Sequence, residues 1–329
     1  QHTRARGGPR TRDPVDSNLG SDKGNQRGRM SEQIKLGFGL YRHQLDGEHF
    51  DFARQCGATH LVVHLCDYFH QGDAGSSPDG GNQPVGGSGG WGVAKGATDP
   101  IWSFEGLDAL RTEVESHGLA LWAVENFDPA MWSDVLLDGP RKDLQMGGLQ
   151  KVIRDVGRAG IPVFGYNFSL AGVCSREIGP VARGNARRVY MKTVDESQMP
   201  AGMVWNMRYE AGREGTAVGK VSHDELWRRL GWFLERLVPV AEEAGVRLAA
   251  HPDDPPMPTI RGTARLVYQP RLYQRLLDLA PSPNNALEFC LGSLQEMSEG
   301  DVYESIEQYG RQNAIAYVHF RNVKGKVPK

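Results

Sequence analysis

The sequence has few cysteines, no long apolar run and no excess of either charge, and each shortage excludes a class of protein. Four cysteines in 329 residues are too sparse and irregular for a disulfide framework, so we expect free thiols in a reducing compartment. No apolar run approaches the roughly 18 residues that a membrane span needs, and the start does not resemble a signal peptide. A formal net charge of -2 gives no global reason to bind nucleic acid or an anionic membrane. We therefore expect a cytoplasmic protein whose partner is a small molecule.

Residues 1–29 differ in composition from the rest. They carry seven Arg or Lys and three Asp, with only Val15 and Leu19 as sizeable aliphatic residues. Such a segment cannot bury enough apolar surface to offset the entropy lost on ordering. We expect a disordered or non-native tail at 1–29, followed by a single domain at 30–329.

After Met30, short apolar runs rich in β-formers alternate with amphipathic stretches. The predicted strands are 34–40, 59–65, 119–124, 161–166, 246–250, 286–290 and 314–319. The predicted helices include 48–55, 104–116, 149–159, 223–244, 270–279 and 302–309. This alternation predicts a parallel sheet with helices outside it. A (β/α)8 TIM barrel, an α/β fold, suits the number of units better than an open sheet. In addition, no Gly-rich dinucleotide motif, which is typical of the open sheet, follows the first strand.

Two long insertions and a missing eighth strand distinguish this chain from a regular barrel. The segment 72–96 is rich in glycine and follows the second predicted strand, while 168–222 is a long excursion after the fourth. Loops at this end of a barrel build substrate sites, but they also serve as decoration or subunit contacts, and the sequence leaves these alternatives open. Strand counting reaches seven rather than eight, so we expect that the sequence as given lacks a C-terminal strand and helix.

The last three predicted strands each end in a residue able to bind a metal: His251, Cys290 and His319. Adjacent strand ends lie about 5 Å apart in a barrel, so three donors from consecutive strands can meet at one ion. Two imidazoles and a thiolate suit Fe, Co or Zn, and Mn if a carboxylate is added. Each residue taken alone is more simply explained by a structural role, but the recurrence of such residues at equivalent positions of three strands favours a metal site. For Asp253 and Asp254 two roles are equally compatible with the sequence: they can accept a hydrogen bond that orients an imidazole, or they can form a turn.

Three blocks of sequence resemble the mannonate dehydratase family. They are His251-Pro-Asp-Asp-Pro-Pro256, Glu288-Phe-Cys-Leu-Gly-Ser293 and Tyr317-Val-His-Phe-Arg-Asn-Val323. The resemblance extends more loosely from Ile34 to Val323. It implies a metal-bearing barrel of the xylose-isomerase-like group that converts D-mannonate to 2-keto-3-deoxy-D-gluconate in hexuronate and glucuronate breakdown.

The resemblance also implies roles for residues. His251, Cys290 and His319 fall on the family's metal ligands, and the implied cofactor is a divalent ion, Mn²⁺ or Fe²⁺. The family's fourth ligand, an Asp, and the neighbouring acid/base His lie on an Arg-Pro-Asp-His segment that this sequence does not contain. We therefore expect the acid/base residues beyond Lys329, and the catalytic residues are unassigned.

Other polar residues near the strand ends are candidates to bind a sugar acid. Arg42 and Arg321 can clamp a carboxylate, while Glu125, Asn167 and Asn322 can read hydroxyl groups. His64 lies at the end of the second strand and can also touch substrate, although a purely structural role is favoured for the group His60, His64, Cys66 and His70. The alternatives to a dehydratase are an isomerase or epimerase on the same barrel and an inactive sugar-acid-binding homologue. We also expect a homo-oligomer.

Overall fold

The computed structural model describes residues 34–66, 99–170, 177–182, 187–191, 221–260 and 263–327. From Lys35 onward these residues belong to one compact unit. The predicted tail at 1–29, the insertion at 72–96 and most of the insertion at 168–222 lie outside the described residues. The proposed division into a tail and one barrel domain with two insertions stays a prediction.

Seven parallel strands form the main sheet, in the order β1-β2-β3-β4-β7-β10-β11. Their bounds are β1 Gly37–Tyr41, β2 His60–His64, β3 Ala120–Glu125, β4 Val163–Tyr166, β7 Arg247–Ala250, β10 Asn285–Cys290 and β11 Ile315–His319. Each of the seven predicted strands is confirmed to within a few residues. Their spatial order is also their order along the chain, which is the arrangement that successive βα units produce in a barrel.

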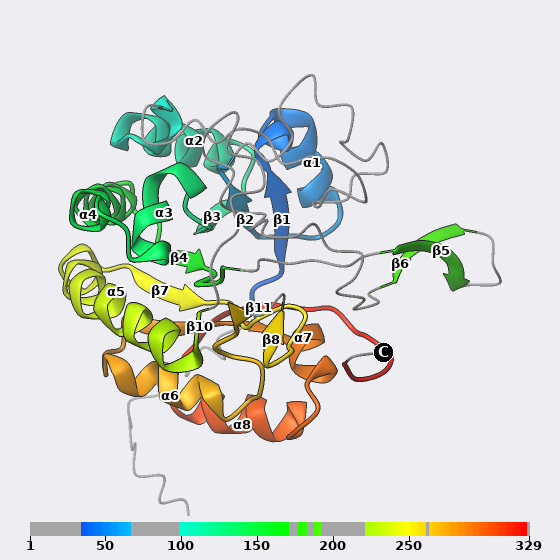
Figure 1. Ribbon diagram of the computed structural model, residues 1–329. Coiled ribbons are helices and arrows are strands. Elements are labelled where there is room, and N and C mark those ends of the chain that lie inside the picture. The colour runs from blue at the N-terminus through cyan, green and yellow to red at the C-terminus, as the bar shows by residue number, and fades with distance from the viewer. Residues whose placement is uncertain are drawn as a thin grey trace, which may run out of the picture. The chain divides into compact units, whose positions relative to one another are not determined.

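The helices lie outside the strands (Figure 1). Their bounds are α1 Gly47–Gln55, α2 Phe104–Ser116, α3 Pro129–Leu137, α4 Lys142–Arg158, α5 His223–Ala244, α6 Leu272–Leu279, α7 Leu291–Glu296 and α8 Val302–Arg311, with short 3-10 turns at Arg42–Gln44 and Pro100–Trp102. The sequence predicted α2 and α5 with the observed bounds. Ser222 caps α5 by accepting a hydrogen bond from the backbone N–H of Glu225, and Gly245 ends it with a φ of 68°, which suits a residue without a Cβ.

Two helical features differ from the sequence prediction. Helix α4 begins at Lys142 rather than at residue 149. Its Gly147-Gly148 pair has low helix propensity, but Met146 and Leu149 on either side are buried, and this burial outweighs the local preference. Helices α3 and α7 were not predicted. With six residues, α7 is shorter than two helical turns and shows little periodicity, and α3 is interrupted at Trp132, whose φ of -144° is not helical.

The sheet is rolled up, so that distant strands meet across its interior. Four strand spacings separate β3 from β11 in the sheet order, which is roughly 19 Å in a flat sheet. Nevertheless, Glu125 Oε2 on β3 lies 3.2 Å from His319 Nε2 on β11. Only strong curvature brings these side chains together, and this confirms the barrel-type fold. Among the described residues, β1 and β11 end the strand order and no ladder joins them.

Alternation along the strands separates an inner face from an outer face. On β10, Leu287 and Phe289 belong to the large apolar core between sheet and helices, so Glu288 and Cys290 have the opposite, inward direction. A smaller inner cluster includes Ala123, Val163, Ala249 and Tyr317. The small residues of this cluster leave space in the interior for polar side chains.

Two short antiparallel pairs lie outside the main sheet. The strands β5 Glu177–Ala182 and β6 Arg187–Met191 pair within the predicted insertion at 168–222, and β8 Thr259–Ile260 pairs with β9 Thr263–Ala264 after β7. In the described part of the chain, no helix combines the length and apolar character that crossing a membrane requires.

Candidate metal centre

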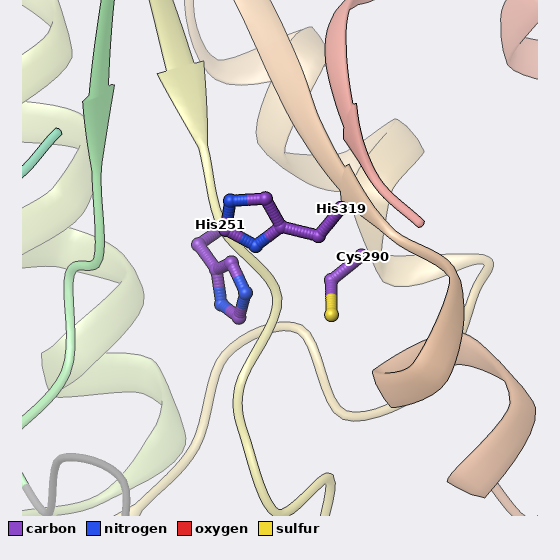
Figure 2. Close-up of side chains that lie close together, drawn as sticks. All are labelled: His251, Cys290 and His319. Carbon is purple, nitrogen blue, oxygen red and sulfur yellow. The ribbon is translucent and has the colours of Figure 1, made fainter. Parts of the chain in front are cut away.

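The three residues that end β7, β10 and β11 gather at one place. One ligand atom from each of His251, Cys290 and His319 lies within 4.8 Å of the others. The two imidazole rings have centroids 5.4 Å apart and an interplanar angle of 52°, and the Cys290 sulfur lies beside them (Figure 2). The predicted convergence of these side chains is therefore present, while their role as metal ligands stays a prediction.

Strand register places the donors at one level of the barrel. Cys290 and His319 are direct partners in the β10–β11 ladder, and His251 follows β7 immediately. The imidazole of His251 is oriented by its Nδ1 atom, which lies 2.6 Å from the carbonyl oxygen of Pro252. Its Nε2 atom is then the nitrogen left to face the other donors.

Cys290 has the surroundings of a thiolate. Its sulfur accepts hydrogen bonds from Ser293 Oγ at 3.2 Å and from Arg321 Nε at 3.3 Å. Burial opposes ionisation, but the neighbouring imidazoles and the Arg321 guanidinium outweigh it and hold the pKa of Cys290 well below its usual value. A thiolate is the form of cysteine that binds a metal.

Two carboxylates lie beside His319 in the barrel interior. His319 Nε2 is 3.2 Å from Glu125 Oε2 and 3.1 Å from Glu288 Oε1. Glu288 is fully buried, and Glu125 is 6% exposed. Burial and the Glu125 charge raise the pKa of Glu288 to about 7, whereas burial of Glu125 is outweighed by His64 and His319, which lower its pKa.

The neighbouring negative groups raise the pKa values of both imidazoles. Burial disfavours protonation of His251, but Glu288 and Cys290 outweigh it and raise its pKa to about 9. Burial is likewise outweighed at His319, where Glu288 and Glu125 raise the pKa well above its usual value. Without a metal, protons balance the buried negative groups. A divalent cation can replace those protons, so the residues present fit a transition-metal ion.

A glycine on β4 makes room for the carboxylates. A Cβ at Gly165 would lie 2.2 Å from the Tyr317 hydroxyl oxygen, 2.9 Å from Glu288 Oε2 and 3.2 Å from Glu125 Cγ. The first two separations are shorter than a Cβ contact allows, so a side chain at this position would displace the Tyr317 hydroxyl and the Glu288 carboxylate. Glycine on β4 therefore leaves these groups in their observed positions.

Some predicted substrate-binding residues lie close to the three donors. His64 Nε2 is 3.6 Å from Glu125 Oε2, and burial lowers the pKa of His64. Asn167 and His251 line one small cavity. Arg321 contacts Cys290 directly and also binds Asp254 Oδ2 at 2.9 Å.

The other predicted substrate-binding residues have partners of their own. Arg42 makes a two-pronged ion pair with Asp99, at 2.9 and 3.2 Å. Asn322 is exposed and its side chain accepts a hydrogen bond from the backbone of Val323. His70, in the histidine group discussed above, lies outside the described residues. All six substrate-binding assignments stay predictions.

Sequence reasoning missed several residues of the site. Glu288 and Tyr317 lie two positions before Cys290 and His319, so alternation along the strands puts each pair on the same face and could have identified them. The two aspartates after His251 orient other groups than an imidazole. Asp254 pairs with Arg321 at 2.9 Å, and Asp253 pairs with the fully buried Arg265 at 2.9 Å.

A family model provides independent evidence on ancestry. The model described as D-mannonate dehydratase (UxuA) matches residues 87–328, a range that contains all three donors. The match therefore covers most of the chain and includes β3 to β11.

Individual relatives agree with the family model. Mannonate dehydratase 2 of Halalkalibacterium halodurans is 31% identical over 71% of this chain and 70% of its own length. The mannonate dehydratase of Thermotoga maritima is 32% identical over 68% of this chain and 66% of its own length. The chain thus spans about two thirds of the length of these curated relatives.

A solved structure has the same fold. The crystal structure of mannonate dehydratase from Streptococcus suis serotype 2 matches with a TM-score of 0.66 and 25% identity, over 88% of this chain and 74% of the other. Sequence and structure comparisons therefore lead to one assignment. The chain belongs to the mannonate dehydratase family, whose members are carbon–oxygen lyases.

Proposed function

We propose that this protein takes part in the dehydration of D-mannonate to 2-keto-3-deoxy-D-gluconate, with a divalent metal ion held by His251, Cys290 and His319. One observation carries the proposal: in a member of the mannonate dehydratase family, three side chains able to bind a metal lie with their ligand atoms within 4.8 Å of one another. Their strands place them at the end of the barrel where enzymes of this fold bind substrate.

We propose Mn²⁺ or Fe²⁺ as the ion, which is what the resemblance to the family implies. Imidazole and thiolate suit Fe, and the oxygen atoms of a sugar acid add the hard ligands that Mn prefers. When bound, such an ion supplies Lewis acidity, which stabilises negative charge on the substrate carboxylate as the proton leaves C2 and helps the C3 hydroxyl group to leave as water.

The protein's own residues bind and orient the substrate. We propose that His64 and Asn167 contact sugar hydroxyls, because both lie beside the three donors. Arg42 and Arg321 are proposed to clamp the substrate carboxylate, and Asn322 to contact a sugar hydroxyl. Arg321 lies beside the Cys290 sulfur, which supports its assignment to the site.

Product analysis tests this function. The full-length protein is incubated with D-mannonate and Mn²⁺ or Fe²⁺, and the products are identified by mass spectrometry and NMR. We expect loss of one water and a 3-deoxy-2-keto acid, and no product after chelation of the metal. A product with the mass of the substrate would instead indicate isomerisation or epimerisation and contradict the proposal. A cytoplasmic location and homo-oligomerisation stay predictions.

A further inference from the structure

The nitrogen atoms of the two imidazoles are held by different partners, and this decides how each ring can face a metal. In His251 the Nδ1 atom is occupied by the Pro252 carbonyl at 2.6 Å. In His319 the Nε2 atom is hydrogen-bonded instead to Glu125 Oε2 at 3.2 Å, and it lies 3.1 Å from Glu288 Oε1 as an ion pair. The nitrogen left to face a metal is therefore Nε2 in His251, which lies 3.7 Å from Glu288 Oε1, and Nδ1 in His319. Figure 2 shows one nitrogen of His319 on the side of His251 and Cys290.

We propose that Glu125 and Glu288 are positioning residues: Glu125 accepts a hydrogen bond from the Nε2–H group of His319 and Glu288 pairs with the same nitrogen by charge, so that His319 binds the metal through Nδ1 while His251 binds through Nε2. This inference rests on the metal role in the proposed function. It gives Glu125 a task other than reading sugar hydroxyls and gives Glu288, which the sequence did not single out, a place in the site.

The chemistry of the interior supports this arrangement. A neutral imidazole that binds a metal through one nitrogen has a proton on the other, and that proton needs an acceptor. Glu125 Oε2 accepts that proton at 3.2 Å, and an ionised acceptor roughly doubles the strength of a hydrogen bond. The fully buried Glu288 adds a second carboxyl group 3.1 Å from the same nitrogen.

The strands are built to keep the carboxylates there. Glu125 ends β3, Glu288 lies in the middle of the pairing between β10 and β11 opposite Tyr317, and Gly165 leaves the space between them. These positions belong to the rigid sheet rather than to loops. Rigid support of this kind holds a metal ligand in one orientation.

Nitrogen NMR tests the proposal directly. The full chain, labelled with ¹⁵N-histidine, is loaded with Zn²⁺ as a diamagnetic substitute, and long-range ¹H–¹⁵N correlations identify the metal-bound nitrogen of each ring. His251→Gln and His319→Gln variants assign the signals. We expect His251 bound through Nε2 and His319 through Nδ1. Zinc bound to Nε2 of His319 would overturn the inference.

Metal affinity gives a second readout. Competition with a chelator is expected to show a loss of roughly 10- to 100-fold in Zn²⁺ affinity for Glu125→Gln and for Glu288→Gln. The matched control is Asp155→Asn, which removes another buried carboxylate that pairs only with surface cations on α4, and its affinity should equal that of the wild type. Unchanged affinity in both glutamate variants would contradict the proposal.

The failure of this inference is distinguishable from failure of the proposed function. Zinc bound through Nδ1 of His319 without any dehydration of D-mannonate would contradict the proposed function and still support the positioning role. A wild-type protein that binds no divalent ion would overturn both. The chelator competition uses other variants than the NMR assignment, so misfolding of a histidine variant does not prevent a decision.

Discussion

At the scale of single residues, the sulfur of Cys290 is surrounded by a network of hydrogen bonds. Ser293 and Arg321 both donate hydrogen bonds to it, and Arg321 is itself held by Ser293, by Asp254 and by Glu296 Oε1 at 3.2 Å. Gly292 allows this approach, because a Cβ there would lie 2.5 Å from the Arg321 guanidinium carbon. The hydrogen bonds withdraw electron density from the thiolate and thereby tune a bound metal.

Removing one of these hydrogen bonds should change the metal–sulfur bond. In the cobalt(II)-substituted protein, Ser293→Ala is expected to move the sulfur-to-cobalt charge-transfer band to longer wavelength, because the thiolate becomes a better electron donor. Ser305→Ala is the control, since Ser305 is also buried and its hydroxyl donates to the carbonyl of Asp301, the residue that caps α8. An absorption band at the same wavelength in Ser293→Ala and wild type would contradict this role.

At the scale of secondary-structure elements, β4 matters because its residue Gly165 has no side chain. Gly165→Ala would force its Cβ against the Tyr317 hydroxyl at 2.2 Å and displace the carboxylates. We expect a loss of about 1 to 3 kcal/mol in the free energy of unfolding, together with weaker metal binding. Chemical denaturation and chelator competition measure the two effects.

A second glycine provides the opposite result as a control. Gly147 lies on the exposed side of α4, and a Cβ there meets no atom within 4 Å. Gly147→Ala should therefore raise the free energy of unfolding by about 0.5 to 1 kcal/mol and leave metal affinity unchanged. If Gly165→Ala also raised the free energy of unfolding, the assigned role of Gly165 would be wrong.

The loop after β7 depends on a buried ion pair. Asp253 pairs with the fully buried Arg265 at 2.9 Å and accepts hydrogen bonds from the backbone of Leu266 and Val267 at 2.7 and 2.8 Å. Asp253→Asn removes the negative charge and is expected to cost about 3 to 5 kcal/mol in the free energy of unfolding. A cost below 1 kcal/mol, measured by denaturation with urea, would show that this pair does not hold the loop that begins at His251.

Sequence reasoning succeeded where a local pattern carries the information. The seven strands alternate with amphipathic segments, and His251, Cys290 and His319 recur at three strand ends. It failed where distant strands combine. Glu125 and Gly165 are partners in the β3–β4 ladder, but Glu288 on β10 reaches them only because the sheet has rolled up. Their shared role depends on curvature that no single stretch of sequence encodes.

At the scale of the whole molecule, the proposed metal site receives side chains from both halves of the barrel. The proposed ligands come from β7, β10 and β11, while β2 and β3 reach the same site through His64 and Glu125. A divalent ion bound at 100 times its dissociation constant stabilises the folded state by about 2.7 kcal/mol. We expect a matching rise in the unfolding midpoint with Mn²⁺, its reversal by chelation, and no rise in Cys290→Ala.

The position of the metal is the central claim, and anomalous X-ray scattering locates it most directly. Crystals of the full-length protein grown with Mn²⁺ are measured on both sides of the manganese absorption edge, with Cys290→Ala crystals measured alongside. The account predicts one strong anomalous peak between His251 Nε2, Cys290 Sγ and His319 Nδ1, absent or much weaker in the variant. Manganese elsewhere, or no peak under reducing conditions with the metal in excess, would contradict it.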